Sequence, residues 1–544
     1  MNASISESSV DRADKLRHQA DWRINPGAED IIEKTPLRVA TVILAAIVLY
    51  LRMPDLFANP QFWGEDIVFY REALQMGLSA FAQPVVGYLL VIPRIASLLA
   101  SKLSPALVPA ILTYASFALT LLVVWLATSP RFVAPLRPIL ALALVVVPAG
   151  VEVLGTITNV QWVMPVGVLI LIFSEPAKSR AVLGLEILFV ATAMLTGPFC
   201  LFFVPILAWQ TYANRDDAAR KTRLLAFASL AILGAAIQAG YILADRNYAL
   251  GTPGLAKDYS PSLWLTQPFR QMLAPWGWQG LGTHVVAESL LDATVAAGIV
   301  FLSFQKPFRD LKLAALALAV AIAVSGMWKY RTILTGATSR YFYILSIAII
   351  WIACCSAPRS RLLAAIAGVV LMLEAAMAVS VMDTPRIFED LEWPAQSRFI
   401  SNGLPVNIPT SPPGWMFSLP AIPNRSMSDL ASWQGQSLAT VTKIRDGATC
   451  DGNTTSILPA GAPSLKKWQI KGAVADQDPP ARAIVLVNND SIVIGIGLTG
   501  FKTSAANQTG WSAIFAAEPG SSVRAYVISS QGNEACRIPG DNVV

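Results

Sequence analysis

The stretch Gln61-Phe-Trp-Gly-Glu-Asp-Ile-Val-Phe-Tyr70 follows directly after the first segment of the chain that is apolar enough to span a bilayer. Charged side chains are costly in a membrane, so adjacent carboxylates at its edge indicate a functional site. We therefore interpret Glu65 and Asp66 as site residues and the apolar chain that follows as the frame that holds them. The alternative is an interfacial turn in which Trp63 and Tyr70 are belt aromatics and both acids are solvated.

The composition is that of a polytopic α-helical membrane protein. Of the 544 residues, 54% are hydrophobic and only 14% are charged, and the mean hydropathy is +0.53. An apolar surplus of this size has no role on a water-facing surface, which excludes an ordinary soluble enzyme. The net charge is only +6, and the basic residues form short clusters between apolar segments. They indicate membrane topology and argue against nucleic-acid binding.

Cysteine and histidine positions limit the chemistry that is available. Cys200, Cys354 and Cys355 lie in apolar segments without metal-like spacing, whereas Cys450 and Cys536 lie in a polar C-terminal region. Only the last two are predicted to form a disulfide. Because the chain has only two histidines, a histidine-based zinc site or a hydrolase triad is disfavoured.

Apolar segments predict about eleven transmembrane helices. They lie at residues 39–53, 107–128, 139–154, 163–173, 181–195, 199–209, 224–243, 290–304, 313–328, 343–356 and 362–382. Residues 1–36 are polar and lack a signal-peptide core, so we expect them in the cytoplasm. Loops rich in basic residues, which prefer the inner face, alternate along the chain with the other loops. This alternation places the C-terminus on the outer side of an inner or plasma membrane. Another apolar segment, residues 87–103, contains Pro93 and Arg94 and is predicted to be re-entrant or interfacial.

Four basic residues are expected on the outer face, against the usual preference of such residues for the inner face. Arg94 follows the acidic stretch, and Lys329, Arg331 and Arg340 lie between two late apolar segments. A lipid phosphate would explain them, since arginine offers a planar fork to phosphate and lysine a mobile charge. The alternatives are snorkelling of Arg94 and neutralisation of the other three by anionic lipid or loop carboxylates.

Polar and aromatic residues of two further outer loops are candidates for sugar contacts. One loop ends in Asn159, Gln161 and Trp162, and a longer loop, residues 244–287, contains several tryptophans and His284. Aromatic rings offer apolar faces on which a sugar can stack. The alternative is an interfacial aromatic belt with capping neighbours.

From residue 383 onward the composition changes to Pro, Ser, Asn and Gly, which indicates a separate extracytoplasmic domain at residues 383–544. β-Branched runs at residues 483–497 and 521–529 predict a β-sandwich within it. Cys450 and Cys536 would bracket most of this domain. Their bridge needs an oxidising compartment such as the periplasm, which the predicted topology supplies independently.

Residues 37–382 resemble the GT-C superfamily of integral membrane glycosyltransferases, which take sugars from polyprenyl-phosphate donors. The resemblance comprises Gly64-Glu65-Asp66 in the first outer loop, the re-entrant segment, about eleven spans, Arg340-Tyr341 opening a late span, and a C-terminal outer domain. It implies that Asp66 or Glu65 is the catalytic base or a metal ligand. Several members carry two acidic sites, and here Glu152 is the second candidate. The resemblance therefore leaves open whether a divalent metal is a cofactor, and no metal ligand is assigned.

The expected function is inverting transfer of a sugar from a polyprenyl-phosphate donor to a cell-envelope glycan or lipid acceptor. Asp66 or Glu65 would remove the acceptor proton, and Arg340, Lys329 or Arg331, with Arg94, would bind the donor phosphate. The residues assigned to the sugar or acceptor are Trp162, Gln161, Asn159, Tyr341, Trp63 and His284.

Two other functions are open. A transporter or flippase of a lipid-linked sugar or small molecule would carry charged residues near mid-membrane and internal repeats. Glu186 and Glu374 are the clear acids inside spans, and no repeat is evident. A non-catalytic envelope-assembly scaffold would bind partners through the C-terminal domain, and its first-loop acids would be dispensable.

Overall fold

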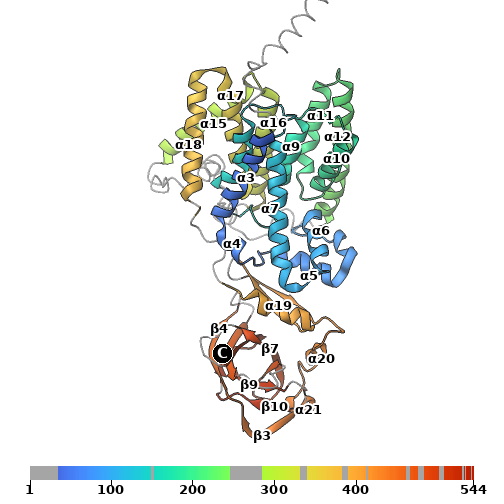
Figure 1. Cartoon of the computed structure of the whole chain (residues 1–544), viewed down its shortest axis with the longest axis vertical. Coiled ribbons are helices and arrows are strands. Elements are labelled where there is room, and N and C mark those ends of the chain that lie inside the picture. The colour runs from blue at the N-terminus through green and yellow to red at the C-terminus, as the bar shows by residue number, and fades with distance from the viewer. Residues whose placement is uncertain are drawn as a thin grey trace, which may run out of the picture. The chain divides into compact units, whose positions relative to one another are not determined.

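The computed structural model describes residues 35–148, 152–244, 285–330, 340–380, 382, 390–411, 415–460, 466–475, 483–501, 508–529, 532, 534–540 and 542–544. It contains two compact units (Figure 1). The helical unit comprises Met1–Met53, Ala82–Ile92 and Ala115–Thr384, and the C-terminal unit comprises Pro54–Phe81, Pro93–Tyr114 and Pro385–Val544. Residues 385–544, most of the stretch predicted as a separate domain, share their unit with two early segments.

Each predicted span overlaps a helix. The helices are α3 (Thr35–Arg52), α4 (Pro54–Ala58), α5 (Asp66–Met76), α6 (Val91–Ala100), α7 (Val108–Ala127), α8 (Arg137–Val146), α9 (Val160–Ile172), α10 (Arg180–Met194), α11 (Cys200–Ala213), α12 (Ala218–Ala244), α15 (Val285–Phe304), α16 (Arg309–Tyr330), α17 (Tyr343–Ser356) and α18 (Arg361–Ser380).

Five described helical segments are long and apolar enough to cross a membrane. They are Thr35–Arg52, Pro105–Ala127, Ala218–Ala244, Arg309–Met327 and Arg340–Arg359. A membrane-spanning helix needs about 20 residues, and α8 and α9 have only 10 and 13. The expected number of about eleven spans is therefore not confirmed, whereas five candidate spans agree with the expected helical membrane protein.

Two helices occupy the centre of the helical unit. Every residue of α9 and of α17 is buried, and both are apolar on all sides, as expected for central helices. The Tyr343 hydroxyl donates to the Leu144 carbonyl (2.7 Å), and the Trp351 indole donates to the Leu140 carbonyl (3.0 Å). These hydrogen bonds fix α17 against α8.

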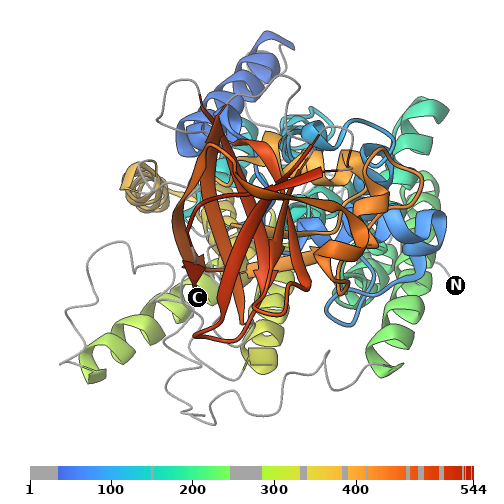
Figure 2. The ribbon, with the colours of Figure 1, turned by 90° about the horizontal axis from the view of Figure 1, so that it is seen from below.

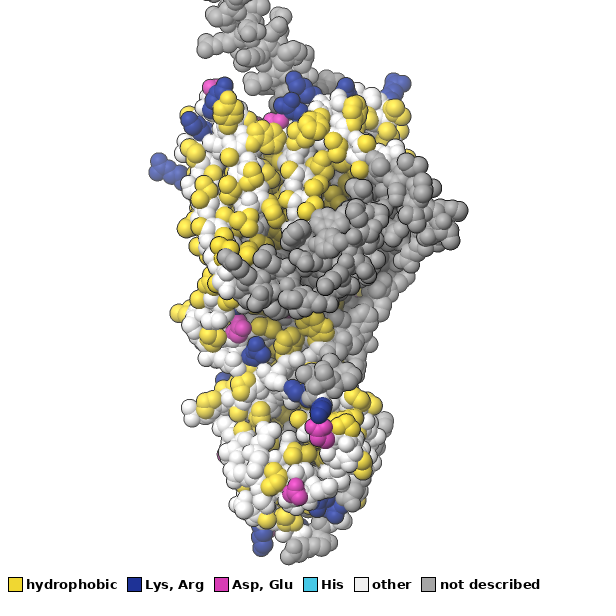
Figure 3. All heavy atoms as spheres, turned by 180° about the vertical axis from the view of Figure 1, so that it is seen from behind, with side chains coloured by type: hydrophobic (Ala, Val, Ile, Leu, Met, Phe, Trp, Pro, Cys, Tyr) yellow, Lys and Arg dark blue, Asp and Glu magenta, His cyan; other side chains and the backbone are white. Residues whose placement is uncertain are grey.

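The surface of the helical unit is apolar over much of its length. Large apolar side chains are exposed on several helices, among them Ile43 on α3, Leu185 on α10, Leu233 on α12, Phe301 on α15 and Leu362 on α18. Figure 3 shows this hydrophobic surface and the Lys and Arg side chains gathered at one end of the unit. An exposed apolar surface of this extent is typical of contact with lipid.

The segment predicted to be re-entrant or interfacial contains α6, whose 10 residues are too few to span a bilayer. Ahead of it, Leu90 pairs with Thr196 in an isolated β-bridge. Gln238 of α12 is fully buried, and its side-chain oxygen accepts from the Leu89 N–H (2.8 Å). Its amide nitrogen donates to the carbonyls of Leu89 and Gly197. Gln238 therefore fixes the backbone that leads into α6.

The strands of the C-terminal unit form a nine-stranded sheet and a separate hairpin. The hairpin consists of β1 (Val406–Thr410) and β2 (Trp415–Leu419), and it follows helix α19 (Trp393–Asn402). The sheet runs in the order β3-β10-β9-β6-β7-β8-β5-β4, with β11 beside β9. Its strands are β3 (Lys443–Thr449), β4 (Gly452–Pro459), β5 (Lys467–Ala475), β6 (Ala483–Val487), β7 (Val493–Phe501), β8 (Gln508–Ala516), β9 (Ser522–Ile528), β10 (Glu534–Arg537) and β11 (Asn542–Val543).

The strand order differs from that of the predicted β-sandwich. A sandwich has two separate sheets, whereas here hydrogen bonding continues from β3 to β4 through one twisted sheet (Figure 2). The edge strands β3 and β4 are joined by a connection of two residues, Cys450 and Asp451. Such a short connection requires the sheet to curl until its two edges meet. A single curled sheet thus encloses a core that includes Ile470, Leu486 and Trp511.

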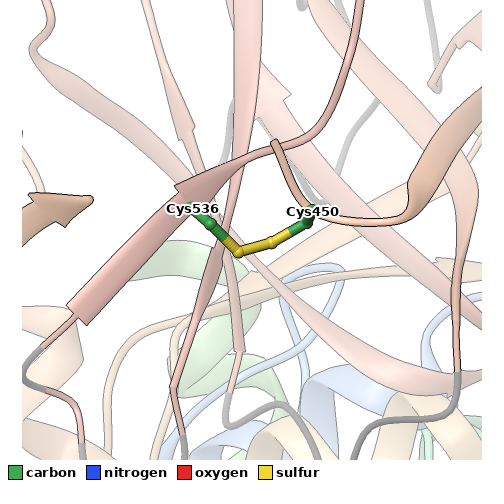
Figure 4. The surroundings of a disulfide bond; sticks show 2 residues. All are labelled: Cys450 and Cys536. Carbon is green, nitrogen blue, oxygen red and sulfur yellow. A yellow bond between two sulfur atoms is a disulfide. The ribbon is translucent and has the colours of Figure 1, made fainter. Parts of the chain in front are cut away.

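Cys450 and Cys536 form a disulfide, as predicted from the sequence (Figure 4). Their Cα atoms are 5.5 Å apart, and the Cys450 N–H donates to the Arg537 carbonyl over 2.9 Å. The bridge links the connection between the two edge strands to β10. It therefore covalently fixes the place where the sheet closes on itself.

Candidate functional site

Many of the predicted site residues lie in two clusters, one in each unit. The Glu152–Arg340 cluster, in the helical unit, comprises Glu152, Gln161, Trp162, Arg340 and Tyr341. The acidic loop, residues 61–66 in the C-terminal unit, contains Trp63, Glu65 and Asp66 and leads into α5.

The polar segment between α8 and α9, which the sequence predicts as an outer loop, is buried within the helical unit. Every residue from 152 to 174 is buried. Irregular backbone at such a place needs internal hydrogen bonds. The Asn159 amide donates to the Glu152 carbonyl (2.9 Å), and Ser116 of α7 donates to the Thr156 carbonyl (3.0 Å). Asn159 thus shapes the segment that carries Glu152.

Glu152 and Arg340 form an ion pair inside the helical unit. The Glu152 Oε1 and Arg340 Nη1 atoms are 2.7 Å apart, and the side chains are only 8% and 17% exposed. Arg340 also lies over the ring of Tyr341, with 5.7 Å between its Cζ and the ring centroid. A buried pair of this kind holds each charge in a fixed position, because separating it would leave an uncompensated charge.

Aromatic rings pack beside this ion pair. The Trp162 ring meets Tyr341 edge-on at 4.8 Å and Phe199 at 5.1 Å between centroids. Gly326 of α16 makes room for the Tyr341 ring, since a Cβ at this position would overlap it. The Tyr341 ring is thereby confined between Trp162 of α9 and Gly326 of α16.

Two polar atoms of α9 in this cluster have no hydrogen-bond partner among the described residues. They are the Trp162 Nε1 and the Gln161 Oε1, and both residues are buried. Gly197 lies against Gln161: its φ is +93°, and a Cβ on it would come within 2.7 Å of the Gln161 Oε1. A buried polar group without a partner costs about 1–3 kcal/mol, so a ligand hydroxyl would be stabilising here.

The acidic loop is held by residues from the C-terminal part of the chain. The Gly64 N–H donates to the Ser411 carbonyl (2.7 Å), and the Ser411 N–H donates to the Phe62 carbonyl (3.0 Å). The Gln61 side chain accepts from the Leu391 N–H over 3.0 Å. The Phe62 ring meets Trp393 of α19 edge-on at 4.7 Å. The acids are therefore presented from a fixed backbone.

The two acids of the loop differ in accessibility. Asp66 is the first residue of α5 and is buried, whereas Glu65 at the helix N-cap is half-buried. Negative charge at this end of a helix is favoured by the helix dipole. Trp63 is buried and pairs with Ser411 in a β-bridge. Glu65 is the carboxylate that a bound molecule reaches more easily.

Arg94 lies in the C-terminal unit and has an acidic partner. Its Nη1 is 2.7 Å from the Glu72 Oε2, and its guanidinium lies 5.3 Å from the Phe69 ring centroid. Arg94 is only 2% exposed. Its guanidinium therefore fixes α6 to α5, a structural role that the sequence pattern did not indicate.

Arg331 and His284 lie outside the described residues, as does the side chain of Lys329. Within the described ranges, no group of three or more His, Cys, Asp or Glu is placed to hold a metal ion. Comparison with protein-family models, with curated proteins and with solved structures finds no match. The function must therefore be inferred from the residues themselves.

Proposed function

We propose that the protein is a membrane glycosyltransferase that moves a sugar from a polyprenyl-phosphate donor to a glycan or lipid acceptor of the cell envelope, with inversion. The observation that carries the proposal is the buried ion pair of Glu152 and Arg340 beside Trp162 and Gln161. A fixed cation, an aromatic ring and unpaired polar atoms together match a sugar phosphate.

Arg340 is proposed to bind the donor phosphate. Arginine recognises phosphate oxygens through charge-assisted hydrogen bonds from a planar fork. The ion pair with Glu152 holds the guanidinium in place. As the bond from the anomeric carbon to the phosphate oxygen breaks, the phosphate takes the electron pair, and the arginine stabilises the added negative charge.

Trp162 and Gln161 are proposed to contact the sugar. Their unpaired polar atoms, the indole N–H and the amide oxygen, offer one donor and one acceptor to sugar hydroxyls. The ring of Tyr341 supports Trp162 from the side. A bound sugar would thus remove the cost of two buried polar groups.

Glu65 or Asp66 is proposed to act as the base, as the resemblance implies. The acceptor hydroxyl gives its proton to the carboxylate while its oxygen forms the new bond to the anomeric carbon. Glu65 is favoured by its greater exposure. Asp66 is buried at the first turn of α5 and is better suited to hold the loop.

The proposed location is an inner or plasma membrane, with residues 1–36 in the cytoplasm and the C-terminal unit on the outer face. The basic end of the helical unit and the disulfide of the C-terminal unit support this orientation. Reporter fusions after Gln210 and Lys306 should be cytoplasmic, whereas fusions after Asn247 and at Val544 should be outside. A cytoplasmic signal at Val544 would overturn the proposed orientation.

The decisive experiment is a transfer assay with the full-length chain in lipid nanodiscs, using radiolabelled polyprenyl-phosphate sugars and a native membrane-glycan extract as acceptor. Labelled product should form, and Glu65→Gln should reduce turnover by about 100-fold or more. Arg340→Ala should weaken binding of the donor. Its matched control is Arg309→Ala, which removes an exposed arginine of α16. Normal transfer by a Glu65→Gln/Asp66→Asn variant would eliminate the proposed base. In sealed vesicles, movement of intact lipid-linked sugar across the bilayer without bond cleavage would favour a flippase instead.

A further inference from the structure

The C-terminal unit contains a pocket of about 240 Å³ in the curled-sheet part of the chain. Its lining includes Thr410 and Trp415 of the β1–β2 hairpin, Gln396 of α19, and Gln469 and Lys471 of the sheet. The volume is below the roughly 300 Å³ at which pockets for drug-sized ligands begin. It suits one or two rings of a small ligand.

The hairpin that carries Trp415 is held firmly to the sheet. Lys467 of β5 donates from its Nζ to the Asn407 side-chain oxygen (2.7 Å) and to the Ser418 hydroxyl (2.8 Å), one on each hairpin strand. Beyond the end of β1, Ser411 is bonded to the acidic loop. The pocket wall is thus preformed, which reduces the entropic cost of binding.

The lining combines polar and apolar side chains with two aromatic residues, Trp415 and Phe501. The Trp415 ring is 46% exposed, which is unusual for so large an apolar side chain. Gln396 is only 4% exposed, and the Thr410 hydroxyl has no hydrogen-bond partner among the described residues. Amides and hydroxyls beside an aromatic ring match alternating C–H faces and hydroxyl groups.

The charges of the lining argue against an anionic ligand. The charged side chains of the pocket are Asp390, Glu392 and Lys471. The Lys471 Nζ lies 3.5 Å from the Glu392 Oε1, and Asp390 adds a second carboxylate, so the net charge of the lining is negative. Two carboxylates and one ammonium group disfavour phosphate and favour a neutral or amino-bearing molecule.

We propose that this pocket binds a saccharide, with the Trp415 ring as stacking face and Gln396, Gln469 and Thr410 as partners of the hydroxyl groups. The assignment of this saccharide as the glycan acceptor rests on the proposed function, whereas its binding does not. The backbone bonds of Ser411 place the pocket and the acidic loop in one continuous structure.

The test is binding of four trisaccharides, maltotriose, cellotriose, mannotriose and chitotriose, to the full-length chain in nanodiscs. Saturation-transfer NMR and calorimetry should detect at least one of them with a Kd of about 1 mM or below. Trp415→Ala should weaken that binding by about tenfold or more, and Trp415→Phe should retain much of it. Val543→Ala removes an exposed apolar side chain of β11 outside the pocket and should bind as the wild type does.

Gln469→Ala is a second variant of the pocket, and its effect on binding does not depend on the tryptophan. It should also weaken binding, because one hydroxyl partner is lost, while inorganic phosphate should not compete with the sugar. Absence of binding by all four trisaccharides, or binding that neither variant changes, would overturn the inference. Binding without any transfer would count against the proposed function alone, and transfer without binding at this pocket would count against the pocket alone.

Discussion

Gly64 donates its backbone N–H to the carbonyl oxygen of Ser411 over 2.7 Å. The two residues are 347 positions apart in the sequence, and the bond joins the acidic loop to the end of β1. Gly64 has a φ of +32°, a value that side chains other than hydrogen rarely allow. The position of the two acids therefore depends on residues that follow the last span.

Ser411→Pro should loosen the acidic loop. Proline removes the N–H that Ser411 donates to the Phe62 carbonyl, a loss of about 1 kcal/mol. Amide hydrogen exchange at residues 61–66 should accelerate by about fivefold to tenfold. Ser411→Ala keeps both backbone bonds and is the matched control. Unchanged exchange in a folded Ser411→Pro variant would show that the loop is held by other contacts.

Arg340→Ala should destabilise the helical unit because Glu152 would be left charged and buried. A loss of about 3–5 kcal/mol is expected from breaking one side of a buried ion pair. Adding Glu152→Gln should restore part of the stability, since no charge is then uncompensated. Thermal unfolding in nanodiscs measures this.

The same double variant separates structure from function. Under the proposed function, donor binding should stay lost although the stability recovers, because no guanidinium remains to meet the phosphate. Recovery of donor binding together with stability would show that Arg340 is structural only.

Gly326→Ala should disturb the aromatic packing without changing any polar group. The added methyl group would overlap the Tyr341 ring and force it away from Trp162. Overpacking of this kind costs about 1–3 kcal/mol in stability, so the melting temperature should fall. The control is Gly368→Ala in α18, where a Cβ meets open space. A melting temperature equal to that of the control would contradict the packing described for Tyr341.

Tyr70→Phe should make the C-terminal unit more resistant to alkali. Burial raises the pKa of Tyr70 above its ordinary value of about 10, and its hydroxyl has no hydrogen-bond partner in the described part of the chain. Above pH 10 the unfolded chain loses this proton while the folded chain keeps it. Stability therefore falls with rising pH in the wild type.

The Phe variant lacks that loss, so its advantage in melting temperature should grow from pH 9 to pH 11. At neutral pH the variant should be as stable as the wild type or more stable, because an unpaired hydroxyl is removed. Tyr212→Phe, at an exposed ring, controls for the general effect of losing a tyrosine. A difference that does not change with pH would contradict the burial of Tyr70.

The helices could be predicted because hydropathy reports directly whether a segment avoids water. The segment 343–356 was predicted with the bounds that α17 has. The disulfide could be predicted because only two cysteines lie outside apolar segments. The curled sheet could not be predicted, because the pattern of strand residues along the sequence is the same whether the strands form one sheet or two.

The partners of the site residues were beyond the sequence pattern. Nothing local to Arg94 indicates Glu72, and nothing local to Gln61 indicates Leu391, because such contacts depend on how distant segments pack. Glu152 was predicted in an outer loop since its neighbours are polar. In the structure Asn159 bonds the Glu152 carbonyl and Ser116 of α7 bonds the Thr156 carbonyl, which permits the burial of this segment.

The division of the C-terminal unit among three stretches of chain has a consequence for biosynthesis. Translation produces residues 54–81 and 93–114 early, and residues 385–544 last. Throughout synthesis of the helical unit, Phe62 and Gly64 therefore lack the backbone partners that Ser411 later provides. A chain that terminates before residue 385 would complete its apolar helices and still leave its earliest loop without the segment that orders it.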